Sequence, residues 1–183
     1  MDPEYEKQIQ LLKTKIKSYQ DFPKKGIVFW DIFSALSDGP TCKLLQNILE
    51  NVVRQKFSGV EAIVGLDARG FLFGFALSAA LGISFLPVRK KGKLPGNLNT
   101  IKYDLEYGSD SISIQKEYVK PGLKCLLVDD LLATGGTLKA AINLLKDCHA
   151  DVRGCVVIME LISLNGRKNI PLDVTLHSLI QYE

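Results

Sequence analysis

The stretch CLLVDDLLATGGT, residues 125–137, runs from apolar residues into two adjacent acids and then into small and hydroxyl residues. An amphipathic helical pattern follows at residues 138–146. A strand, a glycine-rich loop and a helix in this order place the loop's backbone N–H groups at a helix N-terminus, where unpaired donors and the helix dipole favour an anion. The glycines allow close backbone approach, and the threonine hydroxyls can donate to phosphate oxygens. The candidate phosphate loop comprises Ala133, Thr134, Gly135, Gly136 and Thr137.

The two acids, Asp129 and Asp130, stand next to this loop, where they would repel a phosphate unless other groups intervened. A pair of carboxylates accepts hydrogen bonds from two vicinal hydroxyls, such as those of a ribose, and a divalent cation would reduce the remaining repulsion. The alternative is an ordinary strand, turn and helix with two solvated acids. The sequence has no G-x-x-x-x-G-K-[ST] and no G-x-G-x-x-G after a strand, so neither a P-loop nor a dinucleotide fingerprint is present.

Outward from this stretch, apolar strand-like runs alternate with helical patterns, which predicts an α/β fold whose parallel sheet is covered on both faces. The 183 residues, 46% of them hydrophobic, predict one domain, residues 1–183. Ligands of such sheets bind beyond the carboxyl ends of the strands. The expected strands are 61–66, 83–88, 124–129, 154–161 and a last one near 175–180, and the expected helices include 70–82 and 136–148.

Other patterns complete the expected fold. A helical pattern in residues 1–20 places Leu12, Ile16 and Tyr19 on one face, and a short strand is expected at 27–33. Asp38, before a Gly-Pro pair, precedes a second helix. Two alternating segments around EYGSD, residues 106–110, predict a half-exposed β-hairpin.

Composition argues against several classes of protein. The net charge of +3 comes from 23 basic and 20 acidic residues mixed along the chain, so no nucleic-acid surface is expected. The amino-terminal segment has acidic residues and no continuous apolar run, so neither a signal peptide nor a membrane span is expected, and a cytoplasmic location is predicted. The four cysteines lack C-x-x-C spacing and both histidines are isolated, which favours reduced thiols over a zinc site.

Six segments together resemble one family of enzymes. They are DFPKKGIVFWDI (21–32), GLDARGFLFG (65–74), RKKGKLPG (89–96), LEYG (105–108), VDDLLATGGT (128–137) and SLIQYE (178–183). From about residue 20 to the end of the chain, they resemble in the same order the adenine phosphoribosyltransferases, a family of type I phosphoribosyltransferases. The resemblance implies a central, mostly parallel sheet flanked by helices, a flexible catalytic hairpin at about 95–118 and an amino-terminal base-binding hood in residues 1–35.

The resemblance also implies a reaction. It is the purine-salvage reaction in which adenine and 5-phosphoribosyl 1-pyrophosphate give AMP and pyrophosphate. The resemblance further implies that Mg2+ is required and is held through the phosphoribosyl pyrophosphate. It also implies a homodimer. By the same resemblance, Asp129 and Asp130 would bind the ribose hydroxyls, and the candidate phosphate loop would bind the 5-phosphate. Two open alternatives are a non-catalytic paralogue that binds AMP or phosphoribosyl pyrophosphate, and a transferase for another 6-substituted purine.

Diphosphate binding is assigned by the resemblance to two segments. The backbone N–H groups of Asp67, Ala68 and Arg69, with the Arg69 guanidinium, would bind the diphosphate, at a place where the family often has a cis peptide bond that does not involve proline. Arg89, Lys90, Lys91 and Lys93 would add positive charge. The alternatives are an aspartate-capped helix with Arg69 as a surface charge, and a solvated basic loop.

The base site is also assigned by the resemblance. Glu106 would exchange a proton or hydrogen bond with the purine ring, and Tyr107 would help to cover it. The purine would lie against apolar faces and backbone amides of Val28, Phe29, Trp30 and Leu161. The position of Trp30 is usually basic in this family, so this residue is either a neutral change or one that alters turnover or base choice.

Overall fold

A computed structural model of the chain describes residues 3–104 and 109–183. The chain divides into two compact units, residues 1–55 and 56–183, each of which is described by itself. The assignment of all residues to one domain stays a prediction. Among the described residues, no helix has both the length and the apolar composition needed to cross a membrane.

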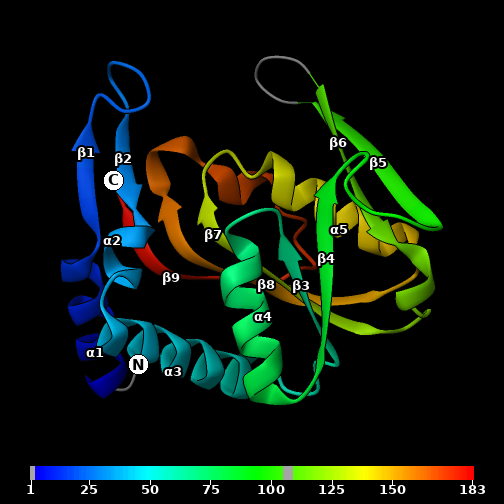
Figure 1. The fold of residues 1–183 in the computed structure, drawn as a ribbon, viewed down its shortest axis with the longest axis horizontal. Coiled ribbons are helices and arrows are strands. Elements are labelled where there is room, and N and C mark those ends of the chain that lie inside the picture. Colours follow the sequence, from blue (N-terminus) through cyan, green and yellow to red (C-terminus); the bar gives the residue numbers. More distant parts are fainter. Residues whose placement is uncertain (1–2, 105–108) are drawn as a thin grey trace. The chain divides into compact units, whose positions relative to one another are not determined.

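The first unit is built from short elements. They are α1 (Pro3–Lys15), β1 (Lys17–Gln20), β2 (Val28–Asp31), α2 (Ile32–Leu36) and all but the last residue of α3 (Gly39–Lys56). Strands β1 and β2 form an antiparallel pair in which Tyr19 faces Phe29 (Figure 1). The start of α3 agrees with the predicted cap, because the Thr41 N–H donates to Asp38 Oδ2 at 3.2 Å.

The helix expected through residue 20 ends at Lys15, so that prediction was wrong for its last turn. The backbone there has other partners. Lys17 N donates to Ser34 Oγ at 2.8 Å, and this hydroxyl is 3.0 Å from the Lys15 carbonyl, so Ser34 serves both sides of the helix end. Residues 17–20 then pair with β2, and Tyr19 is 49% exposed rather than part of a buried helix face. Strand pairing has overridden the helical pattern.

The second unit contains a seven-stranded sheet in the order β5-β6-β4-β3-β7-β8-β9. Its five strands from β4 to β9 in this order are parallel neighbours, while β5 and β6 form an antiparallel hairpin that pairs with β4 (Figure 1). The expected fold class, a central and mostly parallel sheet flanked by helices, is confirmed. The elements are β3 (Ala62–Leu66), α4 (Gly70–Leu81), β4 (Ser84–Lys90), β5 (Leu98–Asp104), β6 (Ser109–Gln115), β7 (Lys124–Leu132), α5 (Gly136–Asp147), β8 (Asp151–Leu161) and β9 (Leu176–Tyr182), with 3-10 turns at Lys116–Tyr118, Ile162–Leu164 and Gly166–Asn169.

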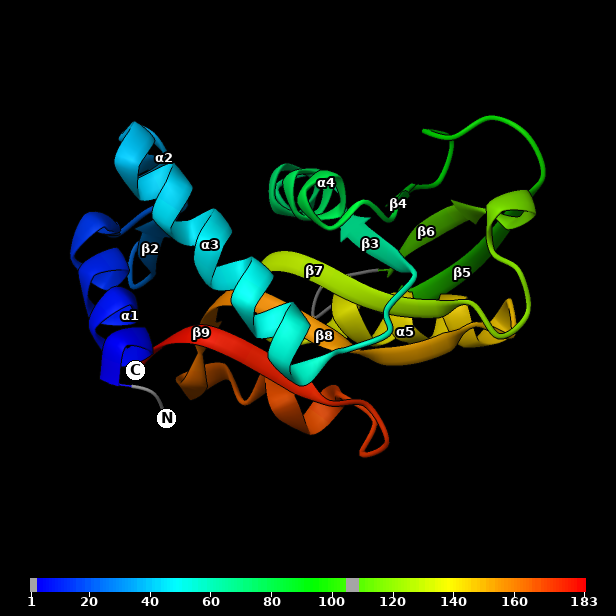
Figure 2. The ribbon, with the colours of Figure 1, turned by 90° about the horizontal axis from the view of Figure 1, so that it is seen from below.

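Two helices, α4 and α5, cover opposite faces of this sheet (Figure 2). Successive side chains of a strand point to opposite faces. Val64 belongs to the buried cluster that includes Leu138 and Leu145 of α5, whereas a Cβ built on Gly74 of α4 would lie 3.4 Å from the Ile63 side chain. The sheet is therefore buried on both sides, which explains why its central strands are almost continuously apolar.

Candidate active site

The candidate phosphate loop lies where the sequence predicted it, between the end of β7 at Leu132 and the start of α5 at Gly136. Gly135 precedes the helix with φ +81°, a left-handed conformation that glycine adopts without a steric penalty. The Gly135 carbonyl accepts the Lys139 N–H at 2.9 Å. The backbone donors of the first helical turn are thus left for a ligand, as the anion site requires.

A turn that the sequence interpretation missed supports this loop. A Cβ built on Gly166 would collide with the Ala133 carbonyl oxygen, and one built on Gly135 would lie 2.5 Å from the Gly166 carbonyl oxygen. Asn169 Nδ2 donates to the Thr134 carbonyl at 2.7 Å. The phosphate loop and the Gly166–Asn169 turn therefore pack backbone against backbone. The Asn-Gly pair in LNGRKN, residues 164–169, is a turn signal, but nothing local says which loop it contacts.

An ion pair between a buried glutamate and an exposed arginine holds this turn on the sheet. Glu160 of β8 is 3% exposed, and Arg167 donates to both of its carboxylate oxygens, at 2.6 and 2.7 Å. Ser178 and Gln181 of β9 donate to Glu160 Oε2 at 2.6 and 3.0 Å. Burial alone would raise the pKa of Glu160, but the hydrogen bonds from Arg167, Ser178 and Gln181 outweigh it and lower the pKa. Glu160 is therefore a charged anchor for the turn.

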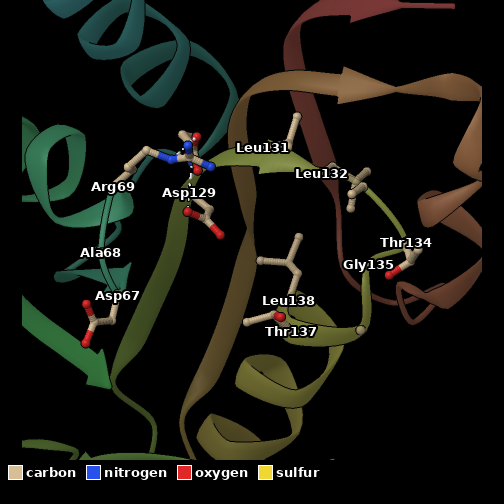
Figure 3. Close-up of a pocket in the computed structure, with 13 residues that line it drawn as sticks. Asp67, Ala68, Arg69, Asp129, Leu131, Leu132, Thr134, Gly135, Thr137 and Leu138 are labelled. Carbon is tan, nitrogen blue, oxygen red and sulfur yellow. Dashed lines mark hydrogen bonds and ion pairs between the residues drawn. The ribbon is translucent and has the colours of Figure 1, made fainter. Parts of the chain in front are cut away.

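The adjacent acids at the end of β7 differ in their partners. Asp130 is 4% exposed, and its Oδ2 lies 2.6 Å from Arg69 Nε, an ion pair whose angles do not meet those of a hydrogen bond. Asp129 is half-buried, and its Oδ1 accepts the Asp130 N–H at 2.9 Å. The Asp129 side chain points toward the middle of the cavity, between residues 67–69 and the phosphate loop (Figure 3).

Burial raises the pKa of Asp129 well above its ordinary value, and the neighbouring charge of Asp130 raises it further. Burial also raises the pKa of Asp130, while Arg69 opposes that rise. Two adjacent carboxylates at this position are costly to ionise. Ligand groups that donate hydrogen bonds or bring positive charge would offset the cost, which agrees with a site for sugar hydroxyls.

Residues 67–69 form the opposite wall of the same cavity (Figure 3). The Asp67-Ala68 peptide bond is cis, as the family resemblance implied. Arg69 precedes α4 and makes no side-chain cap, and Asp67 accepts a hydrogen bond from Arg89 Nε at 2.9 Å. The alternative of an aspartate-capped helix is therefore wrong.

The basic segment at the end of β4 and in the following turn contains both paired and exposed cations. Arg89 is paired with Asp67, and its Nη1 also donates to the Lys93 carbonyl at 3.3 Å. Lys90 Nζ lies 2.9 Å from Asp110 Oδ2 on β6. Lys93 is exposed in the turn that follows β4. The alternative of a purely solvated basic loop does not hold for the first two of these residues.

Most of the predicted site residues line one cavity of about 230 Å³. It lies at the carboxyl ends of β3 and β7, which is where ligands of an open α/β sheet bind. Its lining comprises Asp67, Ala68, Arg69, Asp129, Asp130, Leu131, Leu132, Ala133, Thr134, Gly135, Gly136, Thr137 and Leu138. A second cavity of about 190 Å³ lies beside it and shares Asp67 and Thr137 with it.

The predicted base site is not brought together within either unit. Val28, Phe29 and Trp30 lie in β2 of the first unit, where the Phe29 ring packs edge-on against Phe22 with centroids 5.1 Å apart. Leu161 ends β8 in the second unit. Their common contact with a purine stays a prediction. Glu106 and Tyr107 lie outside the described residues.

This fold and cavity define a phosphoribosyltransferase. A family model described as the phosphoribosyl transferase domain matches residues 36–176 of the chain. The match covers the sheet from β3 to β8, the phosphate loop and the Asp pair.

Similar proteins narrow the class. The chain is 48% identical to the adenine phosphoribosyltransferase of Drosophila pseudoobscura pseudoobscura, with 97% of each chain covered, and 43% identical to that of Clostridium perfringens, with 94% and 98% covered. The crystal structure of the Saccharomyces cerevisiae enzyme with an imino-altritol bisphosphate and adenine matches with a TM-score of 0.91 at 36% identity, covering 95% and 99% of the two chains. The chain therefore belongs to the adenine phosphoribosyltransferase family.

Proposed function

We propose that the cavity between residues 67–69 and the phosphate loop binds 5-phosphoribosyl 1-pyrophosphate and that the enzyme transfers its phosphoribosyl group to adenine, giving AMP and pyrophosphate. The observation that carries this proposal is the arrangement around one cavity of a helix N-terminus, a pair of acids and an arginine-bearing turn. These three parts suit a 5-phosphate, two ribose hydroxyls and a diphosphate, respectively. The base is taken to be adenine because the relatives are adenine phosphoribosyltransferases, and the reaction is one of purine salvage.

In this proposal, the phosphate loop binds the 5-phosphate through its backbone N–H groups and the hydroxyls of Thr134 and Thr137. Asp129 and Asp130 accept hydrogen bonds from the 2- and 3-hydroxyls of the ribose. They thereby fix the sugar so that its anomeric carbon faces the incoming base. Their charge lies beside the ring, where a cationic transition state would be favoured electrostatically.

The leaving diphosphate would bind the backbone of Asp67, Ala68 and Arg69. The cationic side chains assigned to it are Arg69, Arg89, Lys90 and Lys93. In the described parts of the chain, each of the first three has an acidic partner. The diphosphate would therefore share these cations with the carboxylates or displace the carboxylates from them.

A magnesium ion fits this set of donors only as part of the substrate complex. No three His, Cys, Asp or Glu side chains in the described ranges, 3–104 and 109–183, form a group that could hold a metal. Asp129 and Asp130 offer carboxylate oxygens beside the cavity, and Mg2+ is usually bound by one or two carboxylates together with substrate phosphates. The ion would neutralise charge on the diphosphate as it leaves.

The adenine ring would be held by the hood, residues 1–35, and by Leu161. Val28 and Phe29 would supply an apolar face and backbone hydrogen bonds, with Trp30 at the edge. Glu106, in the hairpin at about 95–118, would exchange a proton or hydrogen bond with the ring, and Tyr107 would shield it from water. These roles rest on the family membership and would operate within one domain, residues 1–183.

The enzyme would act as a homodimer. Leu72 and Phe75, three residues apart on α4, are 48% and 63% exposed, in a helix without a charged side chain. Large exposed apolar side chains at helical spacing are typical of an interaction surface. Sedimentation at micromolar concentration, compared with a Phe75→Lys variant, would test whether this face joins two copies; a monomer in both cases would contradict it.

The first experiment is a measurement of AMP formation from adenine and phosphoribosyl pyrophosphate with and without Mg2+, beside guanine and hypoxanthine. We expect Mg2+-dependent AMP and little product from the two oxopurines. No product with any base, together with tight binding of AMP, would instead support a binding protein. Product from a different purine would identify Trp30 as the first residue to change.

A further inference from the structure

Lys90, one of the cations assigned to the diphosphate, has an acidic partner on the neighbouring hairpin. Its Nζ lies 2.9 Å from Asp110 Oδ2, and the two residues end β4 and begin β6, which pair in the sheet. The Lys90 side chain is 65% exposed and that of Asp110 is 23% exposed. The hydrogen bond between them lowers the pKa of Asp110 and raises that of Lys90, so both are charged at neutral pH.

This ion pair lies at the edge of a cavity. Lys90 and Asp110 line the 190 Å³ cavity, which has an apolar floor and shares Asp67 and Thr137 with the proposed substrate cavity. An ammonium group at this place can reach an anion only by leaving or sharing its carboxylate. The floor is formed by Leu66, Val88 and Ile112.

The position of Asp110 is itself held. Asp110 faces Tyr103 in the antiparallel register of β5 and β6, and the Tyr103 hydroxyl lies 3.5 Å from Thr137 Oγ1 of the phosphate loop. Asp110 Oδ1 also accepts the Ser111 N–H at 2.7 Å. The carboxylate is therefore held by a hydrogen bond from its own strand, whereas the partner Lys90 has a long and exposed side chain, so it is the lysine that can move.

We propose that Asp110 is a positioning residue that competes with the diphosphate for Lys90. The inference rests on the proposed function, which assigns Lys90 to the diphosphate. In the free enzyme Asp110 holds the ammonium at the cavity, and the bound diphosphate must draw it away. Asp110 thereby weakens the binding of the leaving pyrophosphate and eases its release.

Titration calorimetry of pyrophosphate with Mg2+ present tests the competition. The variant Asp110→Asn keeps the shape and the Oδ1 acceptor for Ser111 but removes the charge that holds Lys90. We expect pyrophosphate to bind about two- to fivefold more tightly, the factor that corresponds to breaking a part-exposed ion pair. Weaker or unchanged binding to this variant, when it is folded by circular dichroism, would overturn the inference.

A matched control comes from another lysine and aspartate pair in the same unit. Lys146 Nζ lies 2.6 Å from Asp173 Oδ2, and neither residue lines the substrate cavity or the one beside it. Asp173→Asn removes one negative charge in the same way. It should leave pyrophosphate affinity unchanged, and a gain equal to that of Asp110→Asn would show a mere effect of net charge.

The background of Lys90→Ala separates this inference from the proposed function. Lys90→Ala alone should weaken pyrophosphate binding, and if it does not, the assignment of Lys90 to the diphosphate fails. If it does, the gain from Asp110→Asn should be smaller in Lys90→Ala than in the natural chain, because the competed cation is gone. An equal gain in both backgrounds would mean simple repulsion by Asp110 and would overturn the competition.

Discussion

The two walls of the proposed substrate cavity are made in different ways. The phosphate loop offers mainly backbone donors, and it is fixed from behind by the backbone of the Gly166–Asn169 turn and by the ion pair of Arg167 with the buried Glu160. The proposed diphosphate wall, residues 67–69, has Arg69 on the cavity, with Arg89 bound to Asp67 behind it and Lys90 on the second cavity beside it, and all three cations are paired with acids.

The difference concerns what a ligand must rearrange. A 5-phosphate meets donors whose positions are set by the fold, so little ordering accompanies its binding. A diphosphate meets cations that must exchange or share carboxylate partners, so its net affinity is smaller than its charge suggests. We infer that the phosphoribosyl end is the part held firmly, whereas the diphosphate end is the part that is readily released.

The largest effect is expected where the walls meet, at the acids of β7. The double variant Asp129→Asn, Asp130→Asn removes both acceptor charges from the ribose site. We expect kcat/KM to fall by at least about a hundredfold, because loss of correct positioning alone has an effect of that size. Circular dichroism should show an intact fold. Unchanged activity would remove these residues from the ribose site.

The next largest effect is expected from the support of the phosphate loop. In Gly166→Ala the new Cβ would collide with the Ala133 carbonyl, so the loop must move. We expect the KM for phosphoribosyl pyrophosphate to rise about tenfold or more, with little change in the KM for adenine. As a control, Gly39→Ala adds a Cβ that meets no atom within 4 Å, and it should change neither constant. An unaltered KM in Gly166→Ala would refute the supporting role.

A smaller effect should follow from removing one hydrogen bond to the same loop. Asn169→Ala deletes the donor to the Thr134 carbonyl but leaves the backbone packing. A net loss of about 0.5–1.5 kcal/mol corresponds to a rise of about two- to tenfold in the KM for phosphoribosyl pyrophosphate. Steady-state kinetics with each substrate varied in turn would check this. Equal changes for both substrates would indicate a general disturbance rather than a specific support.

These two walls also differ in how far the sequence predicts them. The order of strand, acids, glycines and helix is local, so residues 125–137 were enough to predict the position of the phosphate loop and the fold around it. The support from Gly166 comes from about 30 residues further along the chain, and only the packed sheet brings it to Ala133. The pairing of Lys90 with Asp110 likewise depends on the register of β4 and β6.

The amino-terminal unit shows the opposite case, in which a local pattern misled. Tyr19 continues the helical spacing of Leu12 and Ile16, but its backbone pairs with β2 instead. The competing interaction, antiparallel pairing with residues 28–31, is not visible in a single helical window. The base site assigned by resemblance stays a prediction, because Val28, Phe29 and Trp30 lie in the first unit and Leu161 lies in the second.

The smallest effect is expected on thermal stability, and it comes from the carboxyl group of Asp129, which lies between the two walls. Burial raises the pKa of Asp129 in the folded protein above its value in the unfolded chain. Such a group favours the fold below its unfolded pKa, near 3.9, and this contribution is lost as the pH rises through the folded value. At neutral pH the buried carboxyl group of Asp129 therefore destabilises the protein, and Asp129→Asn should raise Tm by about 2–4 °C for each kcal/mol removed.

Thermal unfolding at pH 7 and pH 4 would measure this effect. The advantage of Asp129→Asn should be clear at pH 7 and shrink toward pH 4, since both states of the natural protein then approach protonation. Asp130→Asn should gain less, because it also removes the partner of Arg69. An Asp129→Asn protein no more stable at pH 7 would mean that the carboxylate is already compensated by groups of the protein. The phosphate loop and the diphosphate wall would then be alike, because the charges of both would be compensated before a ligand binds. Hydrogen bonds from the ribose hydroxyls would then not offset an uncompensated charge at Asp129.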